Sequence, residues 1–103
     1  MQIQVNFGDV ESSPALHDHV EAAVSKALEH VAQHVTRVEA HLRDDKGKRH
    51  GHDDKRVTLE GRIAGEQPLA VDAKGEDLYK VITDAAGKLG RAINHKLEKH
   101  QRA

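Results

Sequence analysis

Hydrophobic and polar residues alternate along four short stretches of the chain. In the first stretch, Ile3, Val5 and Phe7 fall on one side and the polar residues between them on the other. Such alternation is typical of a strand with one buried face. It predicts strands over residues 2–7, 37–42, 56–63 and 69–73. Residues 64–67, which include Gly65, predict a tight turn between the last two strands.

Two longer stretches carry apolar residues at helical spacing. Ser13 followed by Pro14 is a typical helix start, with serine as the N-cap and proline in the first turn. The apolar stripe that follows predicts a helix over residues 14–33. From Glu76 the apolar residues again recur every 3.6 residues on average, so a second helix is predicted to run from there toward the C-terminus.

The predicted elements follow the order βαβββα. Each predicted strand has one apolar face and each helix has one apolar stripe, and these surfaces have to be buried against one another. We therefore expect an α+β fold, a four-stranded mixed sheet with two helices packed on one face. Residues 1–103 are enough for one domain, and we expect a single one.

Composition narrows the possible functions. The chain has 16 Lys and Arg against 17 Asp and Glu, so a nucleic-acid site would have to gather its cations on one face. Phe7 and Tyr79 are its only Phe, Trp or Tyr residues, which argues against base stacking on an aromatic platform. Cysteine is absent, and neither a signal peptide nor an apolar run of membrane-spanning length is seen. We expect a cytoplasmic protein with no membrane contact.

The second predicted helix carries a row of cations on its outer side, formed by Lys80, Lys88, Arg91 and His95. Such a row can follow a phosphate backbone. Asp84 and Glu98 share this side and partly neutralise it. An ordinary solvated helix face is the alternative.

The polar connector at residues 44–54 is the other candidate site. His50, His52 and Asp53 could hold a borderline metal ion, although Lys and Arg residues in the same connector compete for the carboxylates. A plain hairpin loop is the favoured interpretation, so we expect no metal and no cofactor. The chain has no nucleophile elbow, no phosphate-binding glycine loop and no thiol. We therefore expect neither an enzyme nor a small-molecule substrate.

The sequence resembles the ribosome hibernation-promoting factor and ribosome-associated inhibitor family, also described as sigma-54 modulation protein-like. The resemblance is carried by Gly75 through Tyr79, Ile82, Lys88-Leu89 and Arg91, and, at the first helix, by Val10-Glu11, Ala15-Leu16 and Val20. It implies a fold like that of double-stranded-RNA-binding domains. It also implies a factor that binds the small ribosomal subunit in the mRNA and tRNA channel and silences translation under stress. Carried over to this chain, contacts to 16S rRNA phosphates fall on Lys26, Lys88 and Arg91, with Lys80 adjacent and His95 beside them.

The chain departs from the family pattern in its charges. The first predicted helix carries Asp18, Glu21 and Glu29 where the family is rich in cations, and His17 and His95 stand where the family tends to place Lys or Arg. Histidine gains charge between pH 7.5 and pH 6, so we expect RNA binding to tighten in mild acid. Exposed surface histidines without a role in binding are the alternative. The alternative is a non-enzymatic protein on the same fold that has lost rRNA binding and binds a protein partner, or a metal through the 44–54 connector. The sequence leaves the oligomeric state open.

Overall fold

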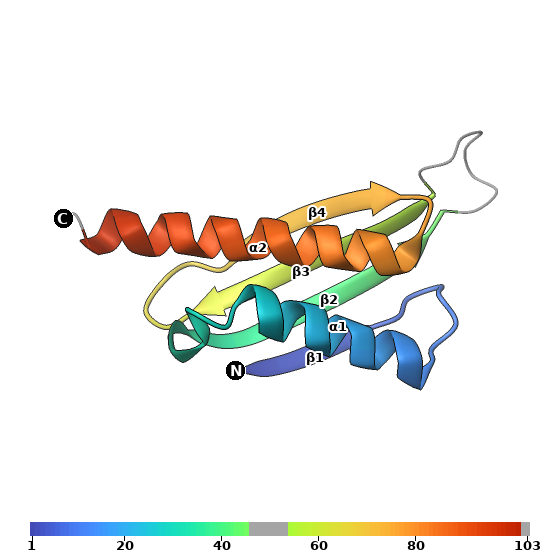
Figure 1. The fold of residues 1–103 in the computed structure, drawn as a ribbon, viewed down its shortest axis with the longest axis horizontal. Coiled ribbons are helices and arrows are strands. Elements are labelled where there is room, and N and C mark those ends of the chain that lie inside the picture. Colours follow the sequence, from blue (N-terminus) through green and yellow to red (C-terminus); the bar gives the residue numbers. More distant parts are fainter. Residues whose placement is uncertain (46–53, 102–103) are drawn as a thin grey trace.

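The computed structural model describes residues 1–45 and 54–101 of the chain. Its elements follow the order β1, α1, η1, β2, β3, β4 and α2 (Figure 1). Their bounds are β1 Gln2–Asn6, α1 Pro14–Ala27, the 3₁₀ turn η1 Ala32–His34, β2 Val35–Asp44, β3 Lys55–Ile63, β4 Leu69–Gly75 and α2 Leu78–Gln101. The predicted order βαβββα is therefore confirmed.

The four strands form one mixed sheet in the order β1-β2-β3-β4. β1 runs parallel to β2, and the other two pairings are antiparallel. The strands β1 and β4 are the two edges. The turn after β3 contains Gly65 at a φ of 76°, and the amide of Glu66 donates to the carbonyl of Ile63 over 3.0 Å. A tight turn therefore lies where the sequence predicted it.

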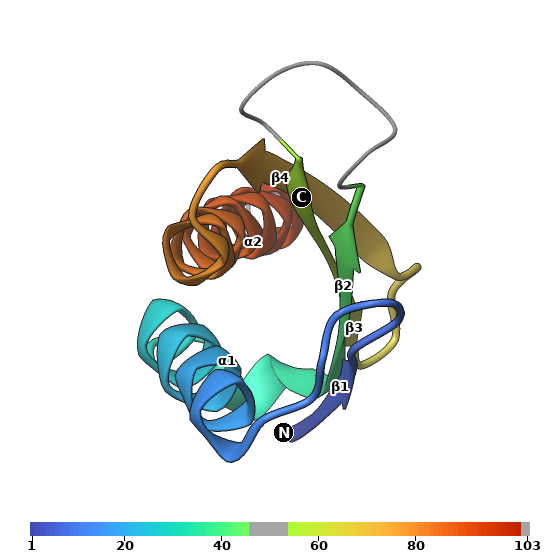
Figure 2. The same ribbon diagram turned by 90° about the vertical axis from the view of Figure 1, so that its right-hand side faces the viewer.

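Both helices cover the same face of the sheet. Figure 2 shows α1 and α2 side by side on one side of the strands. The core between these layers is aliphatic, with fully buried Val20 and Val24 from α1, Leu59 from β3, and Ile82 and Leu89 from α2. None of the described helices or strands covers the opposite face of the sheet (Figure 2). The predicted fold class is confirmed.

The first helix begins as predicted and ends earlier. Ser13 is the N-cap, and its hydroxyl accepts a hydrogen bond from the amide of Leu16 over 3.1 Å. The helix ends at Ala27, so the predicted extension to residue 33 is wrong. Leu28 and Val31 stay buried, but they lie in turns in which the amide of Val31 donates to the carbonyl of Leu28. Apolar residues three or four apart suit both a helix and such turns, and here the chain must turn back to start β2.

The second helix starts at Leu78, two residues later than predicted. Asp77 stands at the cap position, where its carboxylate accepts a hydrogen bond from the amide of Tyr79 over 3.0 Å. Farther along, α2 passes very close to the end of α1. A Cβ placed on Gly90 would lie 2.8 Å from the carbonyl oxygen of Ala27. This approach fixes the distance between the two helices.

None of the helices in the described residues is both long and apolar enough to cross a lipid bilayer.

Candidate nucleic-acid interface

The cations predicted on the second helix all lie on its solvent side. Lys80, Lys88, Arg91 and His95 are exposed, while the intervening Ile82, Leu89 and Ile93 face the core. We call this set the α2 cation face. Asp84 is exposed beside it, as the sequence indicated. Charged groups that stay in water can meet a phosphate without a large desolvation cost.

Lys26 reaches the same region from α1. It lines a groove of about 410 Å³ between the two helices, together with His19, Ala22, Ala23, Ala27, Thr83, Ala86 and Gly87. Gly87 also borders a second hollow, which contains Lys88 and Arg91. Lys26 on α1 and two of the predicted residues on α2, Lys88 and Arg91, therefore border neighbouring hollows of one surface.

This second hollow, of about 560 Å³, lies between α2 and the edge strand β4. Its walls include four cations, Arg56, Lys74, Lys88 and Arg91. Asp72 and Asp84 supply its carboxylates. The sequence reasoning missed Arg56 and Lys74, because they belong to strands and come beside α2 only through the pairing of β3 with β4.

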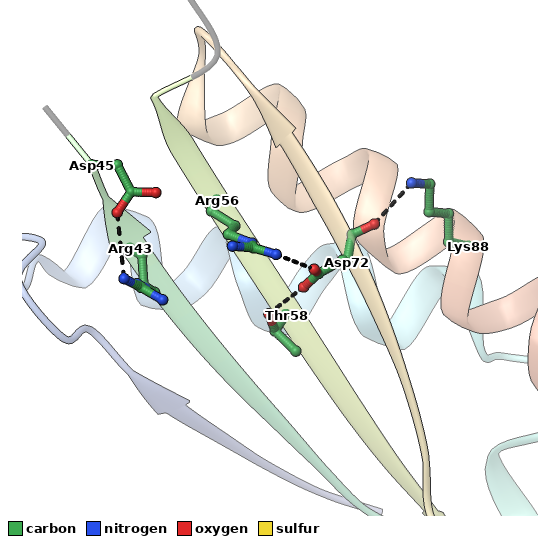
Figure 3. Close-up of polar contacts among 6 residues, drawn as sticks. All are labelled: Arg43, Asp45, Arg56, Thr58, Asp72 and Lys88. Atoms are coloured by element: carbon green, nitrogen blue, oxygen red, sulfur yellow. Dashed lines mark hydrogen bonds and ion pairs between the residues drawn. The ribbon is translucent and has the colours of Figure 1, made fainter. Parts of the chain in front are cut away.

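Lys88 is not a freely projecting side chain. Its ammonium donates a hydrogen bond to the main-chain oxygen of Asp72 over 2.8 Å, so its side chain reaches from α2 to the edge of β4 (Figure 3). β4 is an edge strand, and its outer side finds no partner in the sheet. Lys96 does the same just before β4, where its ammonium donates to the main-chain oxygen of Gln67 over 3.2 Å. Two lysines of α2 thus supply hydrogen bonds along this border.

Asp72 organises the polar groups beside Lys88. Its carboxylate accepts hydrogen bonds from the hydroxyl of Thr58 and from the guanidinium of Arg56, the latter over 2.7 Å (Figure 3). The hydrogen bond from Thr58 and then that from Arg56 lower the pKa of Asp72, aided by the nearby charges of Arg56 and Lys88. The hydrogen bond to Asp72 in turn raises the pKa of Arg56. Asp72 therefore stays ionised and holds Arg56 in place.

The solvent side of α1 carries the opposite charge. Asp18 and Glu21 are exposed, and the Nδ1 atom of His17 lies 3.8 Å from a carboxylate oxygen of each. Ligand atoms of these three residues lie within 4.8 Å of one another, which is also a spacing compatible with a metal ion. Exposed carboxylates beside a histidine are equally an ordinary ion-pair cluster. A protonated His17 would meet these carboxylates before it met a phosphate.

The connector candidates His50, His52 and Asp53 lie outside the described residues, so the expected plain hairpin loop there stays a prediction, with a metal site as its alternative.

His19 is a residue that the sequence reasoning overlooked. Its Nε2 atom lies 3.0 Å from the carbonyl oxygen of Tyr79 and 3.1 Å from the hydroxyl of Thr83. The rings of His19 and Tyr79 meet edge to face with centroids 5.0 Å apart. His19 therefore joins α1 to the first turns of α2. Its spacing of three residues from the buried Leu16 is the signal that could have placed it on the inner border of α1.

Comparison with known proteins agrees with this architecture. The family model described as sigma 54 modulation protein / S30EA ribosomal protein matches residues 3–101. A solved structure of a ribosomal subunit interface protein from Coxiella burnetii is similar, with a TM-score of 0.77 and 20% sequence identity over 100% of both chains. The N-terminal domain of Protein Y from Thermus thermophilus is similar as well. Its TM-score is 0.68, with 18% identity over 91% of this chain and 93% of that one. No curated protein sequence matches significantly.

Proposed function

The chain belongs to the sigma 54 modulation protein / S30EA ribosomal protein family, and on that premise we propose that it binds the small ribosomal subunit and inhibits translation as a hibernation factor. The proposed ligand is the phosphate backbone of 16S rRNA in the mRNA and tRNA channel, and the proposed setting is stress. The protein acts by occupying this channel and catalyses no reaction. A ribosomal partner places it in the cytoplasm.

The observation that carries the proposal is the α2 cation face and its neighbour on α1. Lys80, Lys88, Arg91 and His95 are exposed together on α2, and Lys26 borders the adjoining groove. Phosphate contacts of Lys and Arg supply most of the affinity of such complexes without reading sequence. Arg91 makes no ion pair with any residue that the structure describes, so it offers its whole charge to a ligand.

The two helices contribute unequally to the proposed complex. The exposed side of α1 presents Asp18 and Glu21, which repel a phosphate backbone, whereas α2 presents most of the cations. We therefore assign the main rRNA contact to α2, with Lys26 as a flanking contact.

Co-sedimentation with purified bacterial small ribosomal subunits tests the proposal. Arg91→Gln should weaken binding about five-fold at 0.1 M salt, because one phosphate contact on single-stranded RNA contributes about 0.7 to the salt slope. Arg62→Gln is the matched control, since it removes the same charge from an exposed arginine on the opposite face of the sheet. Absence of co-sedimentation at low salt, at both pH 6 and pH 7.5, would contradict the proposal and favour the non-ribosomal alternative.

A further inference from the structure

The face of the sheet that the helices leave open has a row of three cations across one end. Strand register places Arg43 of β2 directly opposite Arg56 of β3, and Arg56 directly opposite Lys74 of β4. We call these three residues the basic row. Their chain neighbours Leu42, Val57 and Ala73 are buried, so the side chains of the basic row lie on the other face, away from the helices. Figure 3 shows two of the three, Arg43 and Arg56. With strands about 4.8 Å apart, the row spans on the order of 10 Å.

This arrangement is unfavourable for the free protein. Like charges directly opposite on neighbouring strands destabilise a sheet. Arg56 is partly neutralised by Asp72, and Arg43 has Asp45 at 3.5 Å. Lys74 forms no ion pair with a described residue. Unfavourable charge repulsion of this kind is expected on a surface where a bound ligand neutralises it. A polyanion would neutralise the basic row.

The other end of the same face is built differently. Arg37 and Arg62 also lie opposite each other, but each has its own carboxylate, Glu39 at 3.0 Å and Glu60 at 3.3 Å. The charges there balance within the face. The basic row is therefore the end with cationic charge to spare.

The basic row also continues onto α2. Arg56 and Lys74 line the hollow of about 560 Å³ beside β4, and so do Lys88 and Arg91 from the α2 cation face. Lys88 reaches this border itself, since its ammonium donates to the main-chain oxygen of Asp72 (Figure 3). Cations thus extend from α2, along the edge of β4, to the open face of the sheet, with the carboxylates of Asp72 and Asp84 among them.

We propose that RNA held on the α2 cation face continues over the edge of β4 and binds the basic row through its phosphates. This inference rests on the proposed function and extends its site to a second face of the molecule. The contact is mainly to the backbone, because among the described residues neither Tyr79, on α2, nor Phe7, after β1, lies on the open face. The imidazole of His41 does lie on that face, where it contacts Asn6 and Glu39. Binding through the backbone is largely independent of sequence and sensitive to salt.

Affinity for small ribosomal subunits, measured between 50 and 200 mM KCl, tests this extension. Arg43→Gln and Lys74→Gln should each weaken binding about five-fold at 0.1 M salt and lower the salt slope by about 0.7, and together by about 25-fold and 1.4. Arg62→Gln, on the same face but outside the row, should change neither quantity appreciably.

The outcomes separate this inference from the proposed function. If the row variants behave like Arg62→Gln while Arg91→Gln still weakens binding, the extension is overturned and the proposed function stands. If the unaltered protein does not bind, both fall.

Acylation of lysines in the unaltered protein gives an answer that does not depend on folding of a variant. Bound subunits should protect the ammonium of Lys74 together with that of Lys88. Full reactivity of Lys74 in the complex would overturn the extension.

Discussion

Replacing Gly90 and Gly87 by alanine, one at a time, should shift stability in opposite directions. Both residues lie inside α2, where alanine is favoured over glycine by about 0.8–1.0 kcal/mol. At Gly87 the new methyl group meets only the end of the flexible Arg91 side chain, at 3.3 Å, and that side chain can move. Gly87→Ala should therefore raise the free energy of unfolding by up to about 1 kcal/mol.

At Gly90 the same gain competes with a clash. The methyl carbon would lie 2.8 Å from the carbonyl oxygen of Ala27, a backbone atom that moves only if the helices separate. Overpacking of this kind costs about 1–3 kcal/mol, which exceeds the gain in helix propensity. Gly90→Ala should lower the free energy of unfolding by up to about 2 kcal/mol after the gain is subtracted.

Urea unfolding followed by far-ultraviolet circular dichroism measures both changes on one scale. For a domain of this size, a change of about 1 kcal/mol also corresponds to a shift in Tm of about 4–8 °C. If Gly90→Ala stabilised the protein as much as Gly87→Ala does, the close approach of α2 to the end of α1 would be refuted. Equal slopes m in all three proteins would show that the denatured state is unchanged.

Two predictions concern pH. Because the pKa of Asp72 is lowered by folding, the native state binds fewer protons in acid than the unfolded state does. The ionised carboxylate of Asp72 therefore stabilises the fold fully above the ordinary pKa of 3.8, and this stabilisation is lost as the pH falls through the lowered pKa of the native state. Asp72→Asn should lower the free energy of unfolding by up to about 1 kcal/mol at pH 7 and by less at pH 3. Urea midpoints measured at both pH values test this, and equal losses at pH 7 and pH 3 would contradict a lowered pKa of Asp72. Ribosome binding should tighten from pH 7.5 to pH 6 because histidine gains charge. His95→Gln should reduce this tightening more than His17→Gln does, since His17 faces Asp18 and Glu21; an undiminished pH effect in His95→Gln would exclude His95 as the cause.

The start of α1 and its end show what could be predicted from the sequence. Ser13 and Pro14 act on the backbone next to them, so the beginning of the helix follows from local chemistry. The end at Ala27 depends on where the chain must go next, because Leu28 and Val31 are buried equally well in turns. Local pattern decides the first case and tertiary packing decides the second.

The candidate site divides in the same way. The α2 cation face could be predicted because the residues of one helix face follow from their spacing alone. The basic row could not, because it depends on the register between β2, β3 and β4. The short turn around Gly65 constrains the pairing of β3 with β4, but the connector at 44–54 is too long to fix that of β2 with β3. The network around Asp72 depends on the same register.

The lysines on the border of β4 also bear on solubility. An edge strand with free carbonyls and amides is a template on which the strand of another molecule can pair, and proteins often guard such edges with lysine. Lys88 occupies the carbonyl of Asp72, and Lys96 that of Gln67 just before the strand. An ammonium has three N–H donors, so Lys88 can keep this carbonyl and still offer two donors to a phosphate. One side chain can thus protect the sheet edge against aggregation while it takes part in binding. A substitution that removes the ammonium of Lys88 would expose the edge of β4 as well as weaken the complex.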